Sequence, residues 1–175
     1  MESGVVFEDN VVEFVTVSAE YCVYVERIAG KDRQEACDVL LKLLPLLYLK
    51  ASMLPETEES DDAVLSECVT ESDYGYVRSS VNSVFAAEDG YLEVFTEDMQ
   101  YSDMPVCKSV SESLADIYQP LRNFVELFRT GENEIMSEAL AHCREQFVSY
   151  WGQELLNCLR AIHNCRYSQI DTYTD

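Results

Sequence analysis

Residues 39–54, VLLKLLPLLYLKASML, set the strongest limit on the fold, because large apolar side chains fall on every side of a helix drawn through them. A helix that is apolar all round is buried in a protein core or spans a membrane. This run is shorter than the roughly 20 residues that cross a bilayer, and it contains Lys42 and Lys50. We therefore predict a buried central helix, bent at Pro45, which has no N–H to donate to the carbonyl of Leu41.

Amphipathic segments lie on both sides of this stretch. Residues 8–29 repeat apolar side chains at helical spacing, although the β-branched run VVEFVTV would also suit a strand. We favour a helix because the pattern continues for several turns. Gly30 should end this helix, and Asp32 with Glu35 forms the capping-box pattern that would open the central helix.

Three further helices are predicted in the second part of the chain. Thr70 is a candidate N-cap for a helix that runs to Phe85. Ser109 opens the next helix, in which apolar residues recur every three or four positions until Gly131 closes it. A long helix then covers residues 133–165. Its side chains that we expect to face inward are Met136, Ala139, Leu140, Cys143, Phe147, Tyr150, Trp151, Leu155, Cys158 and Ile162.

These segments predict an all-α fold, a single-domain bundle of about five main helices around the buried, proline-bent central helix. A chain of 175 residues suits one domain, and short connections between long helices favour antiparallel packing. The helical domain should cover residues 1–165, with a frayed tail over residues 166–175. The sequence supports almost no strand, although residues 91–108 could form a short strand, a helical turn or an extended cover over the core.

The seven cysteines are odd in number, lie far apart and include no CxxC pair. Most lie among apolar residues, where a free cysteine packs as a small hydrophobic side chain. The first ten residues, MESGVVFEDN, have neither the basic segment nor the apolar run of a signal peptide. We therefore expect a cytoplasmic protein with reduced thiols.

Acidic residues outnumber basic residues by 33 to 12, which gives a net charge of −21. A protein that binds nucleic acid directly needs a basic face, and no basic cluster is visible in this sequence. Binding to an anionic membrane is disfavoured for the same reason. The charge instead suits a protein that binds a basic protein partner.

The negative charge is concentrated in the middle of the chain, where residues 51–107 hold 14 acids and one base, Arg78. One interpretation is a docking surface for a basic partner, or an imitation of nucleic acid that occupies a basic groove. The other interpretation is a solvated acidic loop that binds nothing. If the segment docks a partner, the residues that we expect to bind it are Glu58, Glu59, Asp61 and Asp62.

Motifs for familiar cofactor and metal sites are absent. The glycines spell neither GxGxxG nor GxxxxGK, and the two histidines belong to neither HExxH nor ExxH. Glu138 and His142 share one face of the last predicted helix, but two side chains are too few for a metal site. We therefore expect neither a cofactor nor a metal.

Two residues that disfavour a regular helix, Pro120 and Gly152, lie inside predicted helices and are candidates for functional positions. Pro120 lies deep inside its predicted helix, so the carbonyl of Asp116 lacks its helical donor and could meet a ligand, a water or a neighbouring side chain. Gly152 is unfavourable in mid-helix and indicates close approach of another backbone, with Trp151 packed at the crossing. Both features also suit ordinary packing. If they mark an enzyme site, its candidate residues are Glu112, Asp116, Tyr118 and His142.

Several pieces of the sequence match a known family: EFVTVSAEYC at 13–22, KLLPLLYLKASMLP at 42–55, VTESDY at 69–74, SVSESLADIYQPL at 109–121 and YWGQELLNCLRAIH at 150–163. Through them the chain resembles a bacterial family known only as a domain of unknown function, number five thousand and sixty-three in its series. The resemblance covers nearly the whole chain, so the acidic middle belongs to the domain. It implies a compact, helical, cytosolic protein of bacteria and brings no activity, cofactor or catalytic residue.

Two functions of different class follow from these observations. We favour a non-enzymatic interaction module whose acidic face docks a basic protein. The alternative is a small-molecule or metal-dependent enzyme with its site near Asp116, and a weaker alternative is a nucleic-acid mimic. A deep pocket lined by convergent polar groups near Asp116 would favour the enzyme, whereas a filled core and a flat acidic face would favour the module.

The expectation of reduced thiols can be tested directly. Titration of the denatured, unreduced protein with a thiol reagent should find all seven cysteines reactive, because a cytoplasmic protein has no structural disulfides as a rule. Two or more missing thiols would indicate disulfides or a bound metal instead.

Overall fold

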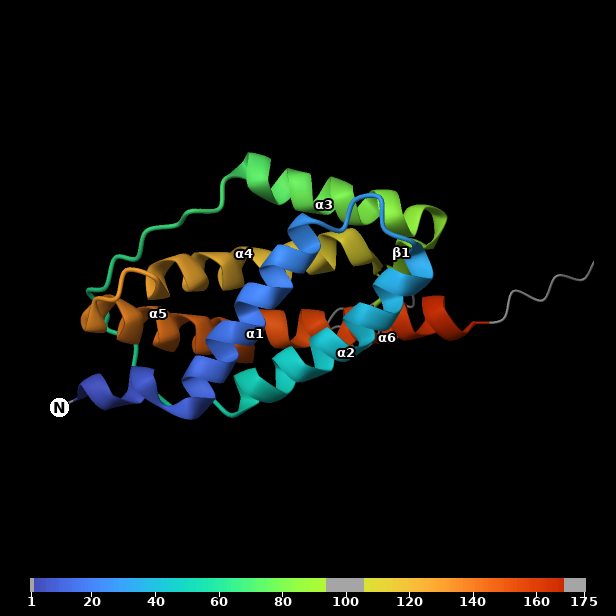
Figure 1. Cartoon of the computed structure of the whole chain (residues 1–175). Coiled ribbons are helices and arrows are strands. Elements are labelled where there is room, and N and C mark those ends of the chain that lie inside the picture. Colours follow the sequence, from blue (N-terminus) through green and yellow to red (C-terminus); the bar gives the residue numbers. More distant parts are fainter. Residues whose placement is uncertain (1, 94–105, 169–175) are drawn as a thin grey trace, which may run out of the picture.

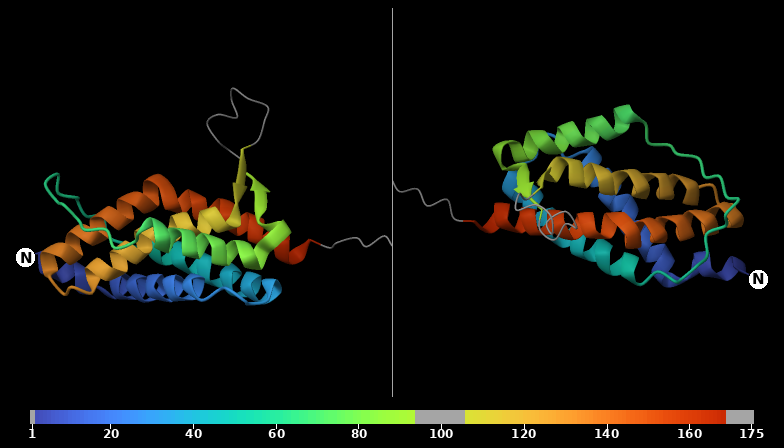
Figure 2. Two further views of the ribbon diagram at one scale, coloured as in Figure 1. Left: turned by 90° about the horizontal axis from the view of Figure 1, so that it is seen from above. Right: turned by 180° about the vertical axis from the view of Figure 1, so that it is seen from behind.

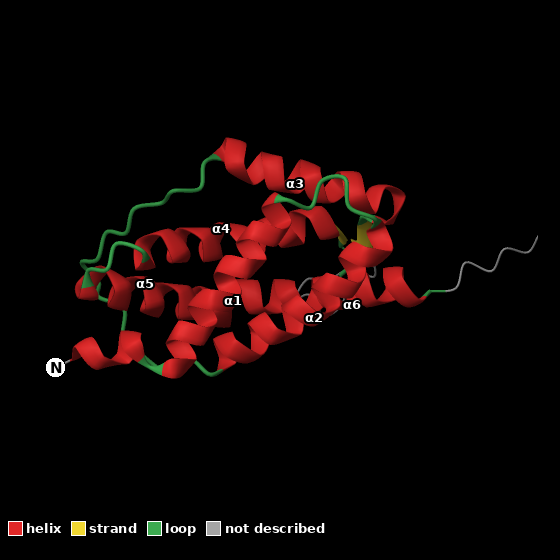
Figure 3. Ribbon diagram, viewed as in Figure 1, coloured by secondary structure: helices red, strands yellow, loops and turns green. Residues whose placement is uncertain are grey.

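Helices make up most of the chain that the computed structural model describes, residues 2–93 and 106–168 (Figure 1 and Figure 3). α5 and α6 continue into one another through a π-helical turn, η4, and form one rod along the molecule (Figure 2, right). The predicted all-α bundle of about five main helices is thereby confirmed. The elements are η1 (Glu2–Phe7), α1 (Asp9–Glu26), α2 (Arg33–Ser52), α3 (Glu71–Phe85), η2 (Ala86–Glu88), α4 (Val110–Phe128), α5 (Asn133–Gln146), η4 (Phe147–Trp151) and α6 (Gly152–Tyr167).

Several helix ends lie where the sequence predicted them, because the predicted caps make their hydrogen bonds. At the start of α2, Asp32 accepts a hydrogen bond from the backbone N–H three residues later (3.2 Å). Thr70 forms a complete capping box at the start of α3, and Ser109 caps α4 (3.1 Å). The turns after α1 and α4 contain left-handed residues, Gly30 (φ 81°) and Gly131 (φ 72°), a conformation that glycine adopts without strain.

α4, rather than α2, occupies the centre of the bundle. It contacts α1, α3, α5 and α6, whereas α2 packs mainly against α1 and α6 at the edge. The predicted central position of residues 39–54 is therefore wrong, and Leu46 and Leu49 on the outer side of α2 are 42% and 52% exposed. Apolar residues on all sides of a helix do not specify how many neighbours cover it. The residues that α2 buries are Ala36, Cys37, Leu40, Leu44, Leu47 and Ala51.

The core between α1, α4 and η4 is built from aromatic rings. The ring centroid of Phe14 lies 5.3 Å from that of Phe124 and 6.4 Å from that of Trp151. Phe147 adds a further contact to Trp151, at 4.7 Å between centroids. Trp151 is fully buried, and its indole N–H donates to the backbone carbonyl of Cys143 (3.3 Å). These large rings join three elements through the apolar area that they bury.

The π-helical turn decides which side chains of the last helix face the core. Seven residues return a regular α-helix to nearly the same face, so Tyr150 would follow Cys143 inward. A π-turn inserts one extra residue, and Trp151 takes the inward position while Tyr150 remains 48% exposed. Of the two residues predicted to face inward at this point, only Trp151 is buried.

The close neighbour that the sequence predicted at Gly152 comes from the same helix and not from a crossing helix. The Gly152 N–H donates to the carbonyl of Phe147, five residues earlier, and closes the π-turn. A Cβ at Gly152 would lie 2.6 Å from that oxygen and 2.8 Å from the Phe147 ring. The turn itself therefore requires glycine.

A two-stranded hairpin stands out from the side of the bundle (Figure 2, left). Its strands, β1 (Gly90–Leu92) and β2 (Cys107–Ser109), pair in antiparallel fashion. Before β1, the buried carboxylate of Asp89 accepts hydrogen bonds from the N–H (2.8 Å) and the hydroxyl (2.6 Å) of Ser111, and so fixes the start of α4. Among the alternatives for this segment, a short strand is confirmed. Residues 94–105 lie outside the described residues.

All seven cysteines are free, as predicted. Burial raises the pKa of the Cys143 and Cys158 thiols, which therefore pack as neutral hydrophobic groups. Within residues 2–93 and 106–168, no helix combines the length and the apolar character that crossing a membrane requires.

Replacing Gly152 with alanine tests the role of the π-turn. The added Cβ would meet the Phe147 carbonyl. We therefore expect Gly152→Ala to lower the free energy of unfolding, measured in urea, by about 1–3 kcal/mol. Gly75→Ala is the matched control, because Gly75 lies inside α3 with nothing within 4 Å of its Cβ position. Alanine should raise stability there by about 0.5–1 kcal/mol. A Gly152→Ala variant that is also stabilised would contradict the assignment.

Candidate functional site

Asp116 lies where two irregular helical segments meet. It precedes Pro120 by one turn of α4, and proline has no N–H to donate to the Asp116 carbonyl. From η4, the Tyr150 hydroxyl donates to Asp116 Oδ2 (3.0 Å). From α3, the Tyr74 hydroxyl donates to Oδ1 (2.7 Å). One carboxylate thus joins three elements that are far apart in the sequence.

The environment keeps both tyrosine hydroxyls protonated. Burial is the main cause that raises the pKa of Tyr74 and of Tyr150, and the hydrogen bond and negative charge of Asp116 raise it further. The two hydroxyls therefore act as hydrogen-bond donors at neutral pH. Hydrogen bonds to a carboxylate are shorter and stronger than those between neutral groups, so this arrangement fixes Asp116 firmly.

A cavity of about 390 Å³ lies beside Asp116, between α4, α5 and the loop that joins α2 to α3. Its volume is in the range of ligand pockets, roughly 300–1,000 Å³. Phe124, Leu127 and Ala139 give it an apolar floor. Its polar lining includes Glu59, Glu67, Asp116, Gln119, Asn123 and His142.

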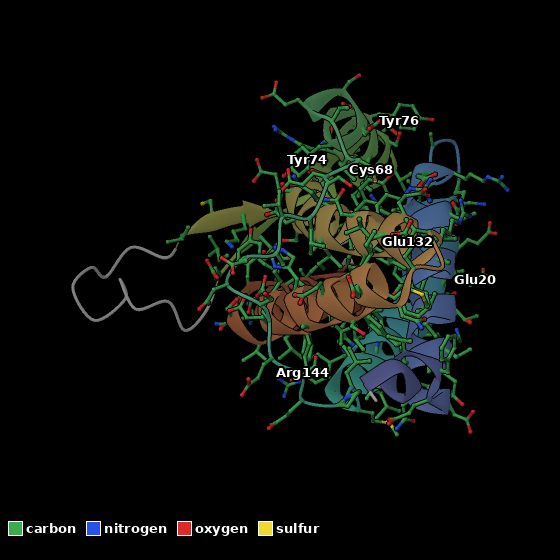
Figure 4. The ribbon with its side chains drawn as sticks, turned by 90° about the vertical axis from the view of Figure 1, so that its left-hand side faces the viewer. Glu20, Cys68, Tyr74, Tyr76, Glu132 and Arg144 are labelled. Carbon is green, nitrogen blue, oxygen red and sulfur yellow. The ribbon has the colours of Figure 1, made fainter. Side chains whose placement is uncertain are left out.

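The loop that covers this cavity, residues 53–70, is called the acidic loop below. Near its start, Arg144 of α5 donates to Glu56 (3.3 Å). At its end, the side-chain oxygen of Asn123 in α4 accepts a hydrogen bond from the N–H of Cys68 (2.8 Å). Figure 4 shows Arg144 and Cys68 at the two ends of the path that the loop follows across the bundle. The loop is therefore held at both ends by helices that line the cavity.

The middle of the acidic loop binds α5 through two further contacts. His142 Nδ1 lies 2.7 Å from Glu59 Oε1, and the Ser60 N–H donates to Glu138 (3.1 Å). Glu138 and His142 share a helix face, as their spacing predicted, and both hold the acidic loop. Among the described residues, no three His, Cys, Asp or Glu side chains are grouped as metal ligands would be.

The cavity has a negative lining. It contains the carboxylates of Glu59, Glu67 and Asp116, and its described lining residues include no lysine or arginine. His142 is already paired with Glu59. Carboxylates around an apolar floor can bind a cation with an aliphatic stem, the form of a lysine or arginine side chain.

Of the four candidate enzyme residues, the structure brings only Asp116 and His142 to this cavity. Glu112 lies one turn before Asp116, is exposed, and approaches Arg78 of α3 at 3.7 Å. Tyr118 donates its hydroxyl to a carboxylate of α1 (3.0 Å). Two residues along a helix rotate a side chain by roughly 200°, so Tyr118 and Asp116 face different neighbours.

The four predicted partner-binding residues lie in the acidic loop, and all are exposed. They are Glu58, Glu59, Asp61 and Asp62.

Tyr74 and Tyr150 were not predicted as partners of Asp116. Little in the sequence indicated these contacts, because Tyr150 lies 34 residues from Asp116 and Tyr74 lies 42 residues away.

A second polar cluster, buried beside the hairpin, was also not predicted. Glu154 of α6 and Glu93 after β1 are 5% and 8% exposed and share one cation, Lys108. The Ser113 hydroxyl donates to Glu154 (3.3 Å), and the Asn157 amide donates to Glu93 (3.0 Å). Burial lowers the pKa of Lys108, but the hydrogen bond and charge of Glu154 and the charge of Glu93 raise it overall. Each charge has a partner, so the cluster fastens the hairpin to the bundle.

Removing either tyrosine hydroxyl tests how strongly Asp116 is held. We expect Tyr74→Phe and Tyr150→Phe each to lower the free energy of unfolding by about 1–2 kcal/mol, because a hydrogen bond to a carboxylate is lost. In double-mutant cycles with Asp116→Asn, the effects should be non-additive. Tyr76→Phe is the matched control on α3, since Tyr76 is 59% exposed (Figure 4). It should change stability by less than about 0.5 kcal/mol. Strictly additive effects would show that the hydroxyls do not act on Asp116.

Comparisons with known proteins confirm the resemblance seen in the sequence. The family described as Domain of unknown function (DUF5063) matches residues 5–168. Among solved structures, the chain is similar to the crystal structure of protein BF1032 from Bacteroides fragilis, with 44% sequence identity and a TM-score of 0.84. This match covers 94% of the present chain and 97% of the other. No curated protein matches the chain. Because the family match spans nearly its whole length, the chain belongs to the DUF5063 family, a domain of unknown function.

Proposed function

We propose that this protein is a non-enzymatic recognition module that docks a basic protein partner, with the cavity at Asp116 receiving a lysine or arginine side chain. The lining of that cavity is the observation that carries the proposal, since Glu59, Glu67 and Asp116 surround an apolar floor. The aliphatic stem of the partner's side chain would cover the floor, and its charged end would meet the carboxylates.

The acidic loop supports a polypeptide partner over an isolated amine. Glu58, Asp61 and Asp62 are exposed in the same loop segment as the cavity-lining Glu59. A partner with several cationic residues would therefore meet negative charge beyond the cavity. The contacts of the loop with α5 hold these charges in place before binding, which reduces the entropy lost on association.

A small-molecule or metal-dependent enzyme is the second candidate. It is favoured by the pocket beside Asp116, which is the feature that we expected of an enzyme, and by the convergence of Asp116 and His142 on that pocket. Both oxygens of Asp116 already accept tyrosine hydrogen bonds, and His142 contacts Glu59. These contacts occupy part of the accepting capacity of Asp116 and one ring nitrogen of His142, which leaves fewer free sites for proton transfer. Imitation of nucleic acid ranks lower, because it requires carboxylates on an open face rather than around a cavity.

The proposal includes a cytoplasmic location, which the seven free thiols support. At cytoplasmic ionic strength the Debye length is roughly 8 Å, so the carboxylates would act on a partner mainly at contact range. Binding through the acidic loop should therefore be sensitive to salt and should depend on the charges at that place rather than on net charge alone.

The proposal can be tested with a fluorescent peptide rich in lysine and arginine, followed by anisotropy. Binding should weaken as sodium chloride rises from about 50 to 300 mM, because screening shortens the range of the charges. Neutralising the loop with Glu58→Gln, Glu59→Gln, Asp61→Asn and Asp62→Asn should weaken it further, by roughly tenfold for a loss of 1.4 kcal/mol. Folding stability should fall by less than about 1 kcal/mol.

Two controls decide between the interpretations. A variant with four other exposed acids replaced by glutamine loses the same net charge and should bind almost normally. Asp116→Asn should weaken binding on its own if the cavity receives a side chain. If the affinity changes neither with salt, nor in the loop variant, nor in Asp116→Asn, the acidic loop is a solvated segment that binds no partner. The four control positions are Glu8, Glu20, Glu132 and Glu134.

A further inference from the structure

Two cysteines meet at the end of the bundle that lies away from the acidic loop. Cys37 is in the first half of α2 and Cys165 is near the end of α6, 128 positions later in the sequence. α2 and α6 pack side by side there (Figure 1), and both thiols line one cavity. The neighbouring residues are also paired, since Arg166 Nε lies 2.7 Å from Asp38 Oδ1. The two cysteines therefore lie at the same place in the contact between the two helices.

The two thiols differ in access. Cys37 is 1% exposed, whereas Cys165 is partly exposed at the edge of the core. Both line a cavity of about 410 Å³ that is also lined by Arg33, Arg160 and Arg166 and by the carboxylate residue Glu88. Reaction with an oxidant requires access to the sulfur as well as the thiolate form of cysteine. Because Cys165 is the more exposed of the two, it is the thiol that a small oxidant can reach first, whereas Cys37 is buried.

We propose that Cys37 and Cys165 are a redox modification site, at which a hydroperoxide-class oxidant such as hydrogen peroxide links α2 to α6 by a disulfide. This inference is independent of the function proposed above, because neither cysteine lines the cavity at Asp116. Disulfides in cytoplasmic proteins, where they occur, are usually transient and formed in response to oxidants.

The chemistry proceeds in two balanced steps. The Cys165 thiolate attacks one oxygen of hydrogen peroxide, the O–O bond breaks, and the sulfur becomes a sulfenic acid as hydroxide leaves and takes up a proton to form water. Cys37 then attacks the sulfenic sulfur, the S–S bond forms, and the hydroxyl leaves with the Cys37 proton as a second water. The two thiols together lose two electrons and two protons, and peroxide gains them.

The environment of Cys37 suits the second step and not the first. Burial and the neighbouring Cys165 thiol raise the pKa of Cys37 to about 12, so it stays protonated while Cys165 is reduced. Oxidation of Cys165 removes that neighbouring thiol and places an electrophilic sulfur in the cavity that Cys37 also lines. Proximity of this kind replaces an encounter in solution, so a weakly acidic thiol can still complete the bond.

Mass spectrometry of the full-length protein tests the proposal. The native protein is treated with hydrogen peroxide, its remaining thiols are alkylated, and it is digested with trypsin without reductant. We expect residues 34–42 and 161–166 to appear as one linked peptide that separates again on treatment with dithiothreitol. The oxidised protein should also unfold at a higher temperature, by on the order of 10 °C, because the bridge closes a long loop.

Variants and alternative outcomes make the test decisive. Cys165→Ser and Cys37→Ser should each abolish the linked peptide and the thermal shift, while Cys107→Ser, which removes an exposed cysteine elsewhere, should change neither. Oxidation of Cys165 to a sulfinic acid with Cys37 still alkylated would overturn the proposal, and so would a bridge to any other cysteine. The wild-type digest decides the question even if a serine variant fails to fold.

Discussion

The π-helical turn at Phe147–Trp151 is the constraint on which both the core and the site depend. One extra residue in the helix places the Trp151 indole against Phe14 and sets the Tyr150 hydroxyl on Asp116. A π-turn is less favourable than a regular helical turn, and burial of a whole indole offsets its cost. Gly152 makes the turn possible, since a side chain there would overlap the carbonyl that closes it. The packing of Trp151 against Phe14 and the hydrogen bond from Tyr150 to Asp116 therefore both result from this turn.

α4 complements this turn with a polar face. Ser113, Asp116 and Asn123 follow one another at helical spacing, and each binds a different part of the molecule. Ser113 binds Glu154 of α6, Asp116 binds two tyrosines, and Asn123 holds the end of the acidic loop. Because α4 lies between the other helices, this face also borders the cavity. The position of the cavity thus follows from the central position of α4.

The two ends of the bundle differ in charge and in chemistry. At one end, α5 holds the acidic loop over a cavity lined by carboxylates. At the other end, Arg33 of α2 and Arg160 and Arg166 of α6 line the cavity that Cys37 and Cys165 share. A net charge of −21 does not reveal this division, because it sums over both ends. The continuous helical stretch of α5, η4 and α6 runs between the two ends and contributes side chains to both sites.

Local sequence patterns were enough to predict the all-α class, the starts of α2, α3 and α4, and the glycine turns. Caps such as Asp32, Thr70 and Ser109 act on a backbone N–H only three residues away, so spacing reveals them. The central position of α4 and the contact of Tyr74 with Asp116 follow from the packing of the helices, and local patterns did not predict them. Periodicity shows that a helix has an apolar side, but the number of neighbours covering it and the hydroxyls that meet one carboxylate depend on how all the helices pack together.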